Sequence, residues 1–104
     1  MIFILSRLVI IKQKTLQQYA LQYPEAKIAI SEWAVKTEVS DWANFTEVKL
    51  VFNSVDYVGD NRYVFNIKGN RYRMIAMIFF SVRTVYIRWF GTHKEYDSIN
   101  VSEV

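Results

Sequence analysis

The first forty residues place apolar side chains at the spacing of two amphipathic helices. In the first helix, apolar residues recur at i, i+3, i+4 and i+7, namely at Leu16, Tyr19, Ala20 and Tyr23. Thr15 is a residue type that caps helix starts, and Pro24 ends or redirects the helix and suits the first turn of the next one. The second helix repeats the apolar spacing at Ala26, Ala29, Ile30, Trp33 and Ala34.

Short elements are predicted on either side of this helical pair. Before it, the apolar run Leu8–Ile11 predicts a short buried strand, with an extension preceding it. After it, Asn44 is followed three residues later by Glu47, which resembles a capping box and predicts a short helix from Thr46 to about Val51. The segment Asp56–Asn61 is rich in Gly, Asp and Asn and is typical of a turn.

The second half of the chain is rich in aromatic and β-branched residues and predicts a three-stranded meander. Its strands are expected at Arg62–Lys68, Arg71–Phe80 and Thr84–Phe90. Gly69 and Asn70 are a two-residue hairpin signal, and this loop places Asn66 opposite Arg73 on one face of the sheet. Arg88 in the third strand joins that face if the intervening turn has the matching parity.

The last predicted element is a short helix in the run THKEYDSI, capped by Thr92. Helices packed on one face of a mostly antiparallel sheet make an α+β fold. We therefore expect a small sheet, formed by the N-terminal strand and the C-terminal meander, packed against the N-terminal helices. The length fits a single domain over residues 1–104, with residues 1–7 as an extension.

Composition excludes several classes of protein. The 104 residues include no Cys, which excludes disulfide scaffolds, thiolate metal sites and cysteine nucleophiles, and a single His gives no support to a His-rich metal site or a Ser-His-Asp triad. Walker and Rossmann phosphate loops are absent from the sequence. The uninterrupted apolar runs are far shorter than the ~20 residues of a bilayer span, and no signal cleavage site follows the first one. We therefore expect a cytoplasmic protein with no membrane segment.

The net charge of +3 is unevenly distributed along the chain. Residues 1–60 carry six basic and seven acidic side chains, whereas residues 61–104 carry seven basic and three acidic ones. Between Asn61 and Lys94 there is no acidic residue, and five of the six arginines lie in this stretch. An Arg-rich segment without acids is a candidate surface for a polyanion, since guanidinium groups match phosphate. The alternative is that these arginines keep a small sheet soluble.

Two groups of residues in the acid-free half of the chain could carry chemistry. On a helix, His93, Tyr96 and Asp97 lie on one face, so that a carboxylate could orient an imidazole beside a phenol. Arg73 and Arg88 each lie in a strongly apolar strand, where an unpaired arginine is costly. With RNA, whose 2′-hydroxyl is the nucleophile, such groups could move protons and stabilise a phosphorane-like transition state without metal. The alternatives are a merely polar helix, and arginines paired with Glu95 or Asp97.

Two stretches, VGDNRYVFNIKGNRYRMIAMIFF and YIRWFGTHKEYD, carry a recognisable pattern. Together with a helix ending in YP and a Trp-Ala-Asn-Phe connection, they resemble the HigB family of type II toxin–antitoxin toxins, which belong to the RelE-like mRNA interferases. The resemblance extends from about Leu8 to Asp97. It implies a small sheet backed by helices, with a basic concave face that receives RNA.

The resemblance also implies roles for individual residues. Arg73 matches the strand arginine that contacts the scissile phosphate, and Arg88 matches the arginine that stabilises the transition state. His93 and Tyr96 match the motif of the C-terminal helix, where His93 is the better candidate for proton transfer and Asp97 would support it. Further RNA contacts are expected at Asn66, Lys68, Asn70, Arg71 and Lys94. No metal and no cofactor are expected.

The partners implied are mRNA in the A site of the 30S ribosomal subunit and a HigA-like helix-turn-helix antitoxin. Operator DNA would be bound only through the toxin–antitoxin complex. The function expected is metal-independent cleavage of mRNA on the translating ribosome through attack of the 2′-hydroxyl. Two alternatives are a non-catalytic RNA-binding module and an interaction or repressor subunit whose charge serves solubility.

Overall fold

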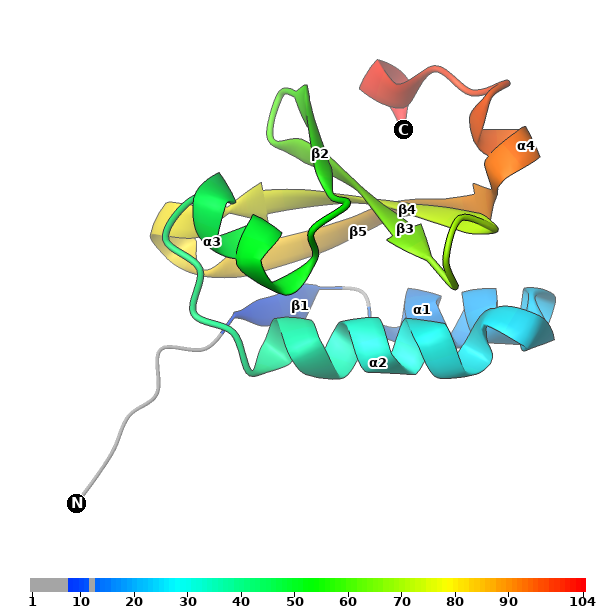
Figure 1. Cartoon of the computed structure of the whole chain (residues 1–104), viewed down its shortest axis with the longest axis horizontal. Coiled ribbons are helices and arrows are strands. Elements are labelled where there is room, and N and C mark those ends of the chain that lie inside the picture. Colours follow the sequence, from blue (N-terminus) through cyan, green and yellow to red (C-terminus); the bar gives the residue numbers. More distant parts are fainter. Residues whose placement is uncertain (1–7, 12) are drawn as a thin grey trace.

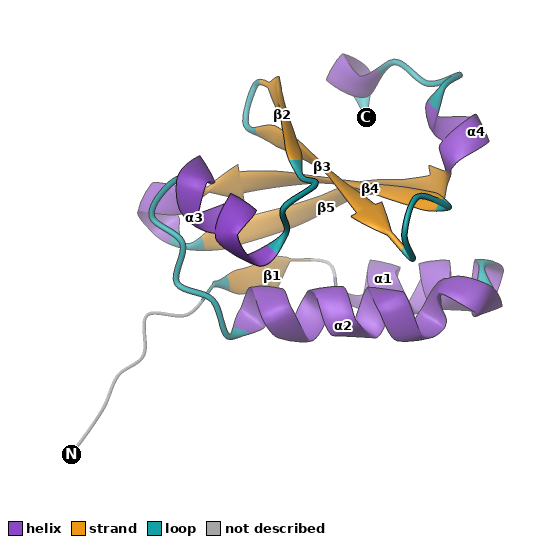
Figure 2. Cartoon of the chain, viewed as in Figure 1, coloured by secondary structure: helices purple, strands orange, loops and turns teal. Residues whose placement is uncertain are grey.

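A computed structural model describes residues 8–11 and 13–104, and Figures 1 and 2 show its elements. Five strands form one sheet in the order β1-β5-β4-β3-β2, with bounds β1 Val9–Ile11, β2 Asp56–Gly59, β3 Arg62–Ile67, β4 Tyr72–Phe79 and β5 Thr84–Thr92. The helices are α1 Gln13–Gln22, α2 Lys27–Glu38, α3 Phe45–Val51 and α4 His93–Tyr96, with 3₁₀ turns η1 Pro24–Ala26, η2 Phe80–Val82 and η3 Val101–Glu103. The expected extension over residues 1–7 lies outside the described residues. The α+β prediction is confirmed.

The sheet has two differently covered faces (Figure 1). Helices α1 and α2 run side by side across one of them, which we call the helix-covered face. On the other side, α4 and the C-terminal segment curl back over the sheet toward β2. We call this second side the distal face; it presents alternate residues of β3 and β4, namely Arg62, Val64, Asn66, Arg73, Ile75 and Met77.

The predicted register of the central hairpin is confirmed. Asn66 pairs with Arg73, and Phe65 pairs with Met74 on the opposite face. The Arg71 N–H donates to the Lys68 carbonyl at 3.3 Å, so the Gly-Asn pair forms the tip of the turn as expected. Because side chains alternate along a strand, this register decides which residues reach the distal face.

The segment expected as a turn over residues 56–61 is a strand followed by a turn. Its first part forms β2, where Asp56 pairs with Val64, and only Asp60 and Asn61 have the positive φ angles of a tight hairpin turn. The ring of Tyr57 lies 4.9 Å from that of Tyr63, a cross-strand aromatic contact that stabilises β2 at the edge of the sheet. The expected three-stranded meander therefore has a fourth strand.

The third expected strand is longer than predicted and irregular. It pairs in parallel with β1 through Thr84 and antiparallel with β4, but its register with β4 shifts between Ile75 and Ala76. Trp89 pairs with Ile75 and Ile87 with Ala76, so Arg88 is the extra residue of a β-bulge. The simple parity on which the expected position of Arg88 depended does not hold.

Helix starts match the expected capping in two of three cases. The Asn44 side chain accepts from the Glu47 N–H at 3.1 Å, which starts α3 within one residue of the prediction. Thr92 and Glu95 form a complete capping box at the start of α4. The prediction that Thr15 caps the first helix is wrong: α1 already begins at Gln13, because the Gln-Lys pair before Thr15 has good helix propensity.

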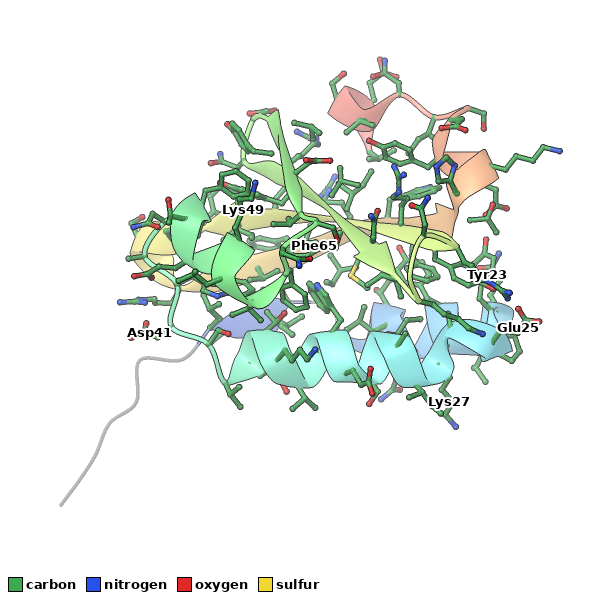
Figure 3. The ribbon with its side chains drawn as sticks, viewed as in Figure 1. Tyr23, Glu25, Lys27, Asp41, Lys49 and Phe65 are labelled. Carbon is green, nitrogen blue, oxygen red and sulfur yellow. The ribbon has the colours of Figure 1, made fainter. Side chains whose placement is uncertain are left out.

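Aromatic packing fills the space between the sheet and α2. Trp33 packs edge-on against Phe65 at 5.3 Å, and Phe65 packs edge-on against Phe52 at 5.2 Å. Trp42 is also buried and meets Phe52 edge-on. Figure 3 shows Phe65 directed from β3 into this region. Within the described ranges, no helix is long and apolar enough to cross a membrane.

Candidate active site

Arg73 lies at the centre of a cluster on the distal face. Its guanidinium carbon lies 5.0 Å from the centre of the Tyr96 ring, a cation–π contact between β4 and α4. Its Nη2 donates to the side-chain oxygen of Asn70 at 3.3 Å, and Asn66 lies beside it across the ladder. Its Nε is buried and has no hydrogen-bond partner among the described residues. The cluster therefore presents a held guanidinium with unused donor capacity.

The helix that carries Tyr96 is only one turn long and is fixed by its attachments. The His93 N–H donates to the Arg71 carbonyl at 2.9 Å, which joins α4 to the start of β4. The carboxylate of Glu95 accepts from the Thr92 N–H and from the hydroxyl of Tyr23, both at 2.8 Å. Tyr23, labelled in Figure 3, belongs to the loop after α1, so this bond joins α4 to the helical layer.

Both groups of the Tyr23–Glu95 pair have shifted acidities. Hydrogen bonds from the Thr92 backbone and from Tyr23 lower the pKa of Glu95. The pKa of Tyr23 rises to about 12, because burial disfavours the phenolate and because the neutral hydroxyl donates to Glu95. Each group favours the form that makes the bond, so the attachment is intact at neutral pH.

A tryptophan and a glycine form the wall next to Tyr96. The Trp89 ring lies 6.1 Å from the Tyr96 ring. A Cβ atom at Gly91 would lie 2.6 Å from the Trp89 ring and 2.8 Å from the Glu95 carboxylate, so only glycine leaves room for both. Gly91 pairs with Arg73 across the ladder, which places this close packing directly beside the arginine.

His93 and Asp97 form the expected pair on one face of α4. The His93 Nδ1 lies 3.5 Å from the Asp97 carboxylate, and both side chains are partly exposed. The structure therefore brings together Asn66, Asn70, Arg73 and Tyr96 by direct contact or pairing, and it places the imidazole and its carboxylate one turn away on the same short helix.

Arg88 contacts a different part of the molecule. Its Nε donates to the main-chain oxygen of Val104 at 3.3 Å, and no ion pair joins Arg73 or Arg88 to Glu95 or Asp97 among the residues that the structure describes. The alternative in which these carboxylates neutralise the two arginines is therefore not what the structure shows. The two arginines do not contact each other's partners.

The other predicted RNA contacts lie around the rim. Lys68 donates through Nζ to the main-chain oxygen of Glu25 at 3.1 Å, and Arg71 lies 3.9 Å from the Glu25 carboxylate. Both therefore turn toward η1, where Figure 3 labels Glu25, and not toward Arg73. Lys94 is exposed on α4.

One arginine of the distal face was missing from the sequence prediction. Arg62 is 7% exposed, pairs with Asp60 at 2.8 Å, and donates to the Val104 oxygen from Nη2 at 2.9 Å. The signal that could have found it is its parity, because residues 62, 64 and 66 of one strand share a face with Arg73. No three His, Asp or Glu side chains lie close enough to hold a metal ion in the described part of the chain.

Comparison with known proteins gives the family. Residues 26–99 match the family model described as HigB_toxin, the RelE-like toxic component of a toxin-antitoxin system. The chain belongs to the HigB toxin family. It is 38% identical over 91 residues to the mRNA interferase toxin HigB of Escherichia coli (strain K12), which covers 85% of this chain and 86% of the relative. The mRNA interferases HigB of Escherichia coli O157:H7 and of Shigella flexneri match with the same identity and coverage.

The HigB match contains the distal-face cluster but not every residue that contacts it. It includes Arg62, Arg73, Arg88 and all of α4. Tyr23, which holds Glu95, precedes the matched range, and the segment ending at Val104 follows it. The attachment of α4 and the contact at Arg62 therefore include residues of this chain beyond the HigB family pattern.

Proposed function

We propose that this HigB-family chain is an mRNA interferase, a metal-independent endoribonuclease that cleaves mRNA on the translating ribosome. The observation that carries the proposal is the Arg73 guanidinium, held over the Tyr96 ring with a buried, unpartnered Nε. A buried cation with unused donors suits an anionic group that arrives with a ligand. The names of the relatives, mRNA interferase, support RNA as that ligand.

The reaction proposed is transfer of a phosphoryl bond within RNA. The 2′-oxygen attacks the adjacent phosphorus while its proton passes to a base, and the bond from phosphorus to the 5′-oxygen breaks as that oxygen takes a proton from an acid. The products are a 2′,3′-cyclic phosphate and a 5′-hydroxyl end. No water or metal enters this step, so the balance requires only a base, an acid and positive charge.

The roles proposed follow from chemical type and position. Arg73 binds the scissile phosphate, and Arg88 stabilises the negative charge of the transition state. His93 transfers a proton, oriented by Asp97 at 3.5 Å, and Tyr96 lies under Arg73 as the second proton-transfer group.

The remaining cations and amides would hold the RNA on either side of the cleaved bond. Asn66 and Asn70 flank Arg73, whereas Lys68, Arg71 and Lys94 extend the basic surface to the rim. We further propose that the toxin acts in the cytoplasm in the 30S A site, that a HigA-like helix-turn-helix antitoxin neutralises it, and that operator DNA is bound only through their complex. Membership of a toxin–antitoxin family supports an antitoxin partner.

Substitution of Arg73 tests the proposal. Arg73→Ala should reduce mRNA cleavage about 10²–10³-fold, the usual effect of removing one donor to transition-state charge, and should relieve growth arrest. The matched control is Arg83→Ala, since Arg83 pairs with Asp41 at the far end of β5 and should leave cleavage unchanged. The readout is mRNA 5′ ends mapped in cells, with and without translation.

Three outcomes separate the alternatives. Full toxicity in Arg73→Ala and also in His93→Ala contradicts the proposal. Salt-dependent RNA binding with no cut product in the unsubstituted protein favours a non-catalytic binding module. Cutting that persists when translation is blocked keeps the nuclease but removes the ribosome from the proposal.

A further inference from the structure

Arg62 and Arg88 converge on one oxygen atom at the far end of the distal face. The main-chain oxygen of Val104 accepts from Arg62 Nη2 at 2.9 Å, from Arg62 Nε at 3.3 Å and from Arg88 Nε at 3.3 Å. Three guanidinium N–H groups directed at a single oxygen are the arrangement that a phosphate oxygen receives from arginine. The β-bulge at Arg88 brings about this convergence by turning that side chain out of the regular alternation.

The position has more positive than negative charge. Arg62 is buried and its one acidic partner, among the described residues, is Asp60, whose side chain is 77% exposed. Arg88 has no acidic partner in the described chain. Two guanidinium groups beside a single exposed carboxylate leave a site that attracts a further anion.

The site lies in line with the Arg73 cluster. Arg62 pairs with Met77 on the same face on which Asn66 pairs with Arg73, four residues farther along β3. At a rise of roughly 3.3 Å per residue, the two arginine rows are about 13 Å apart. One extended RNA strand crossing the distal face can therefore reach both rows with different phosphates.

The segment that now fills the site is attached weakly to the sheet. Residues 98–104 bond mainly among themselves and to α4, as when Ser102 donates to Asn100 and Ile99 donates to Tyr96. Apart from the bonds of Arg62 and Arg88 to Val104, no hydrogen bond joins this segment to a strand among the described residues. Figure 2 shows it as a loop and a short turn that pass over the strands.

We propose that Arg62 and Arg88 form a second phosphate-binding site for the RNA substrate, and that the Val104 oxygen occupies it in the free protein. The inference rests on the proposed function, since it assigns a second phosphodiester of the same RNA to this chain. Binding of RNA replaces the Val104 oxygen by a phosphate oxygen and releases the C-terminal segment. The segment thereby competes with the substrate.

The test measures binding without cleavage. The ligand is an oligonucleotide with a 2′-deoxy sugar at the cleaved position, which lacks the nucleophile, and inorganic phosphate is titrated in parallel. The ¹⁵N resonances of the Arg62 and Arg88 Nε–H groups report occupation of the site. We expect both resonances to shift with the oligonucleotide, and removal of residues 101–104 to tighten its binding about three- to tenfold, as loss of competing hydrogen bonds predicts.

Substitutions provide the control for the competing segment. Arg88→Gln, at an exposed position, should weaken binding and reduce the dependence of affinity on salt by about one phosphate contact. In that variant, removal of residues 101–104 should have a smaller effect, because one of the two arginines that prefer the segment is gone. Arg62→Lys repeats the measurement at the buried position, and Arg83→Gln should change nothing.

The outcomes distinguish this inference from the proposed function. If removal of residues 101–104 leaves the affinity unchanged, or if the oligonucleotide shifts neither resonance while phosphate does, the second site is not an RNA site and the inference is wrong. If every variant binds the oligonucleotide as expected and none cuts RNA, the inference holds and the nuclease proposal fails.

Discussion

The two faces of the sheet are built from the same strands and differ in what they bury. On the helix-covered face, β4 presents Tyr72, Met74, Ala76 and Ile78, all of them part of the core. On the distal face, the intervening positions include Arg73, whose partners are an amide and an aromatic ring. The alternation of side chains along one strand therefore supplies stability on one face and chemistry on the other.

The contrast also concerns how polar groups are satisfied. The helix-covered face holds aromatic rings that pack edge-on, an arrangement that needs no partner outside the chain. The distal face holds guanidinium groups whose neighbours are main-chain oxygens or a side-chain amide, which are weaker partners than an anion. The face that is less well satisfied in the free protein is the one arranged for a ligand.

Truncation of a core ring should break the helix-covered face. Phe65→Ala is expected to lower the free energy of unfolding by about 3–5 kcal/mol, because the cavity would lie between Trp33 and Phe52. Phe79→Ala, at a half-buried ring at the end of β4, is the matched control and should cost less. Urea unfolding measures both, and equal losses would show that the two faces do not differ in stability.

Adding a methyl group at Gly91 should disturb the distal face without touching the core. Gly91→Ala is expected to cost about 1–3 kcal/mol, because the new Cβ meets the Trp89 ring and the Glu95 carboxylate. The displaced ring should also move Tyr96 and reduce RNA cleavage by more than the loss of stability explains. Urea unfolding and cleavage below the unfolding range check this, and unchanged values in both would mean that the wall is not needed.

The smallest effect is expected at the bond that joins the two sides, Tyr23 to Glu95. Because the folded pKa of Glu95 lies below its ordinary 4.5, the stability it contributes is present above that pH and is lost as pH falls through the lowered value. The raised pKa of Tyr23 has the opposite sign: its contribution is present below pH 10 and is lost as pH rises through about 12.

Tyr23→Phe should therefore cost about 0.5–1.5 kcal/mol at pH 7, as for one hydrogen bond, and should flatten both pH limbs. Unfolding measured from pH 3 to pH 11 gives the result. Tyr57→Phe, whose ring lies at the far edge of the sheet, is the control, and a variant as steep as the unsubstituted protein at both ends would contradict the assignment.

Local chemistry explains which parts of this fold could be predicted. The Gly-Asn turn and the cap at Thr92 are specified by neighbouring residues, so the Asn66–Arg73 register and the start of α4 followed directly from the sequence. Strand β2 could not be recognised, because four residues beside a turn signal have no periodicity of their own and depend on the Tyr57–Tyr63 contact made across the sheet.

The site could be predicted only as far as regular alternation holds. The bulge at Arg88 leaves no mark in the sequence, since Thr84–Phe90 alternates without a break, and it separates Arg88 from the Arg73 cluster. Arg62 was missed because its partner Val104 is 42 positions away, a distance over which one sequence carries no signal. Lys68 and Arg71 were expected near RNA by position alone, and their contacts with Glu25 depend on how η1 packs.

The bond between Tyr23 and Glu95 spans 72 positions, which sets the order in which the molecule can be completed. The N-terminal helices leave the ribosome first, but α4 gains its attachment only after β5 has been synthesised and paired. A growing chain therefore has no organised cluster of His93, Tyr96 and Arg73. A nuclease directed at messages under translation would thus remain inactive toward its own message until the last strand is in place.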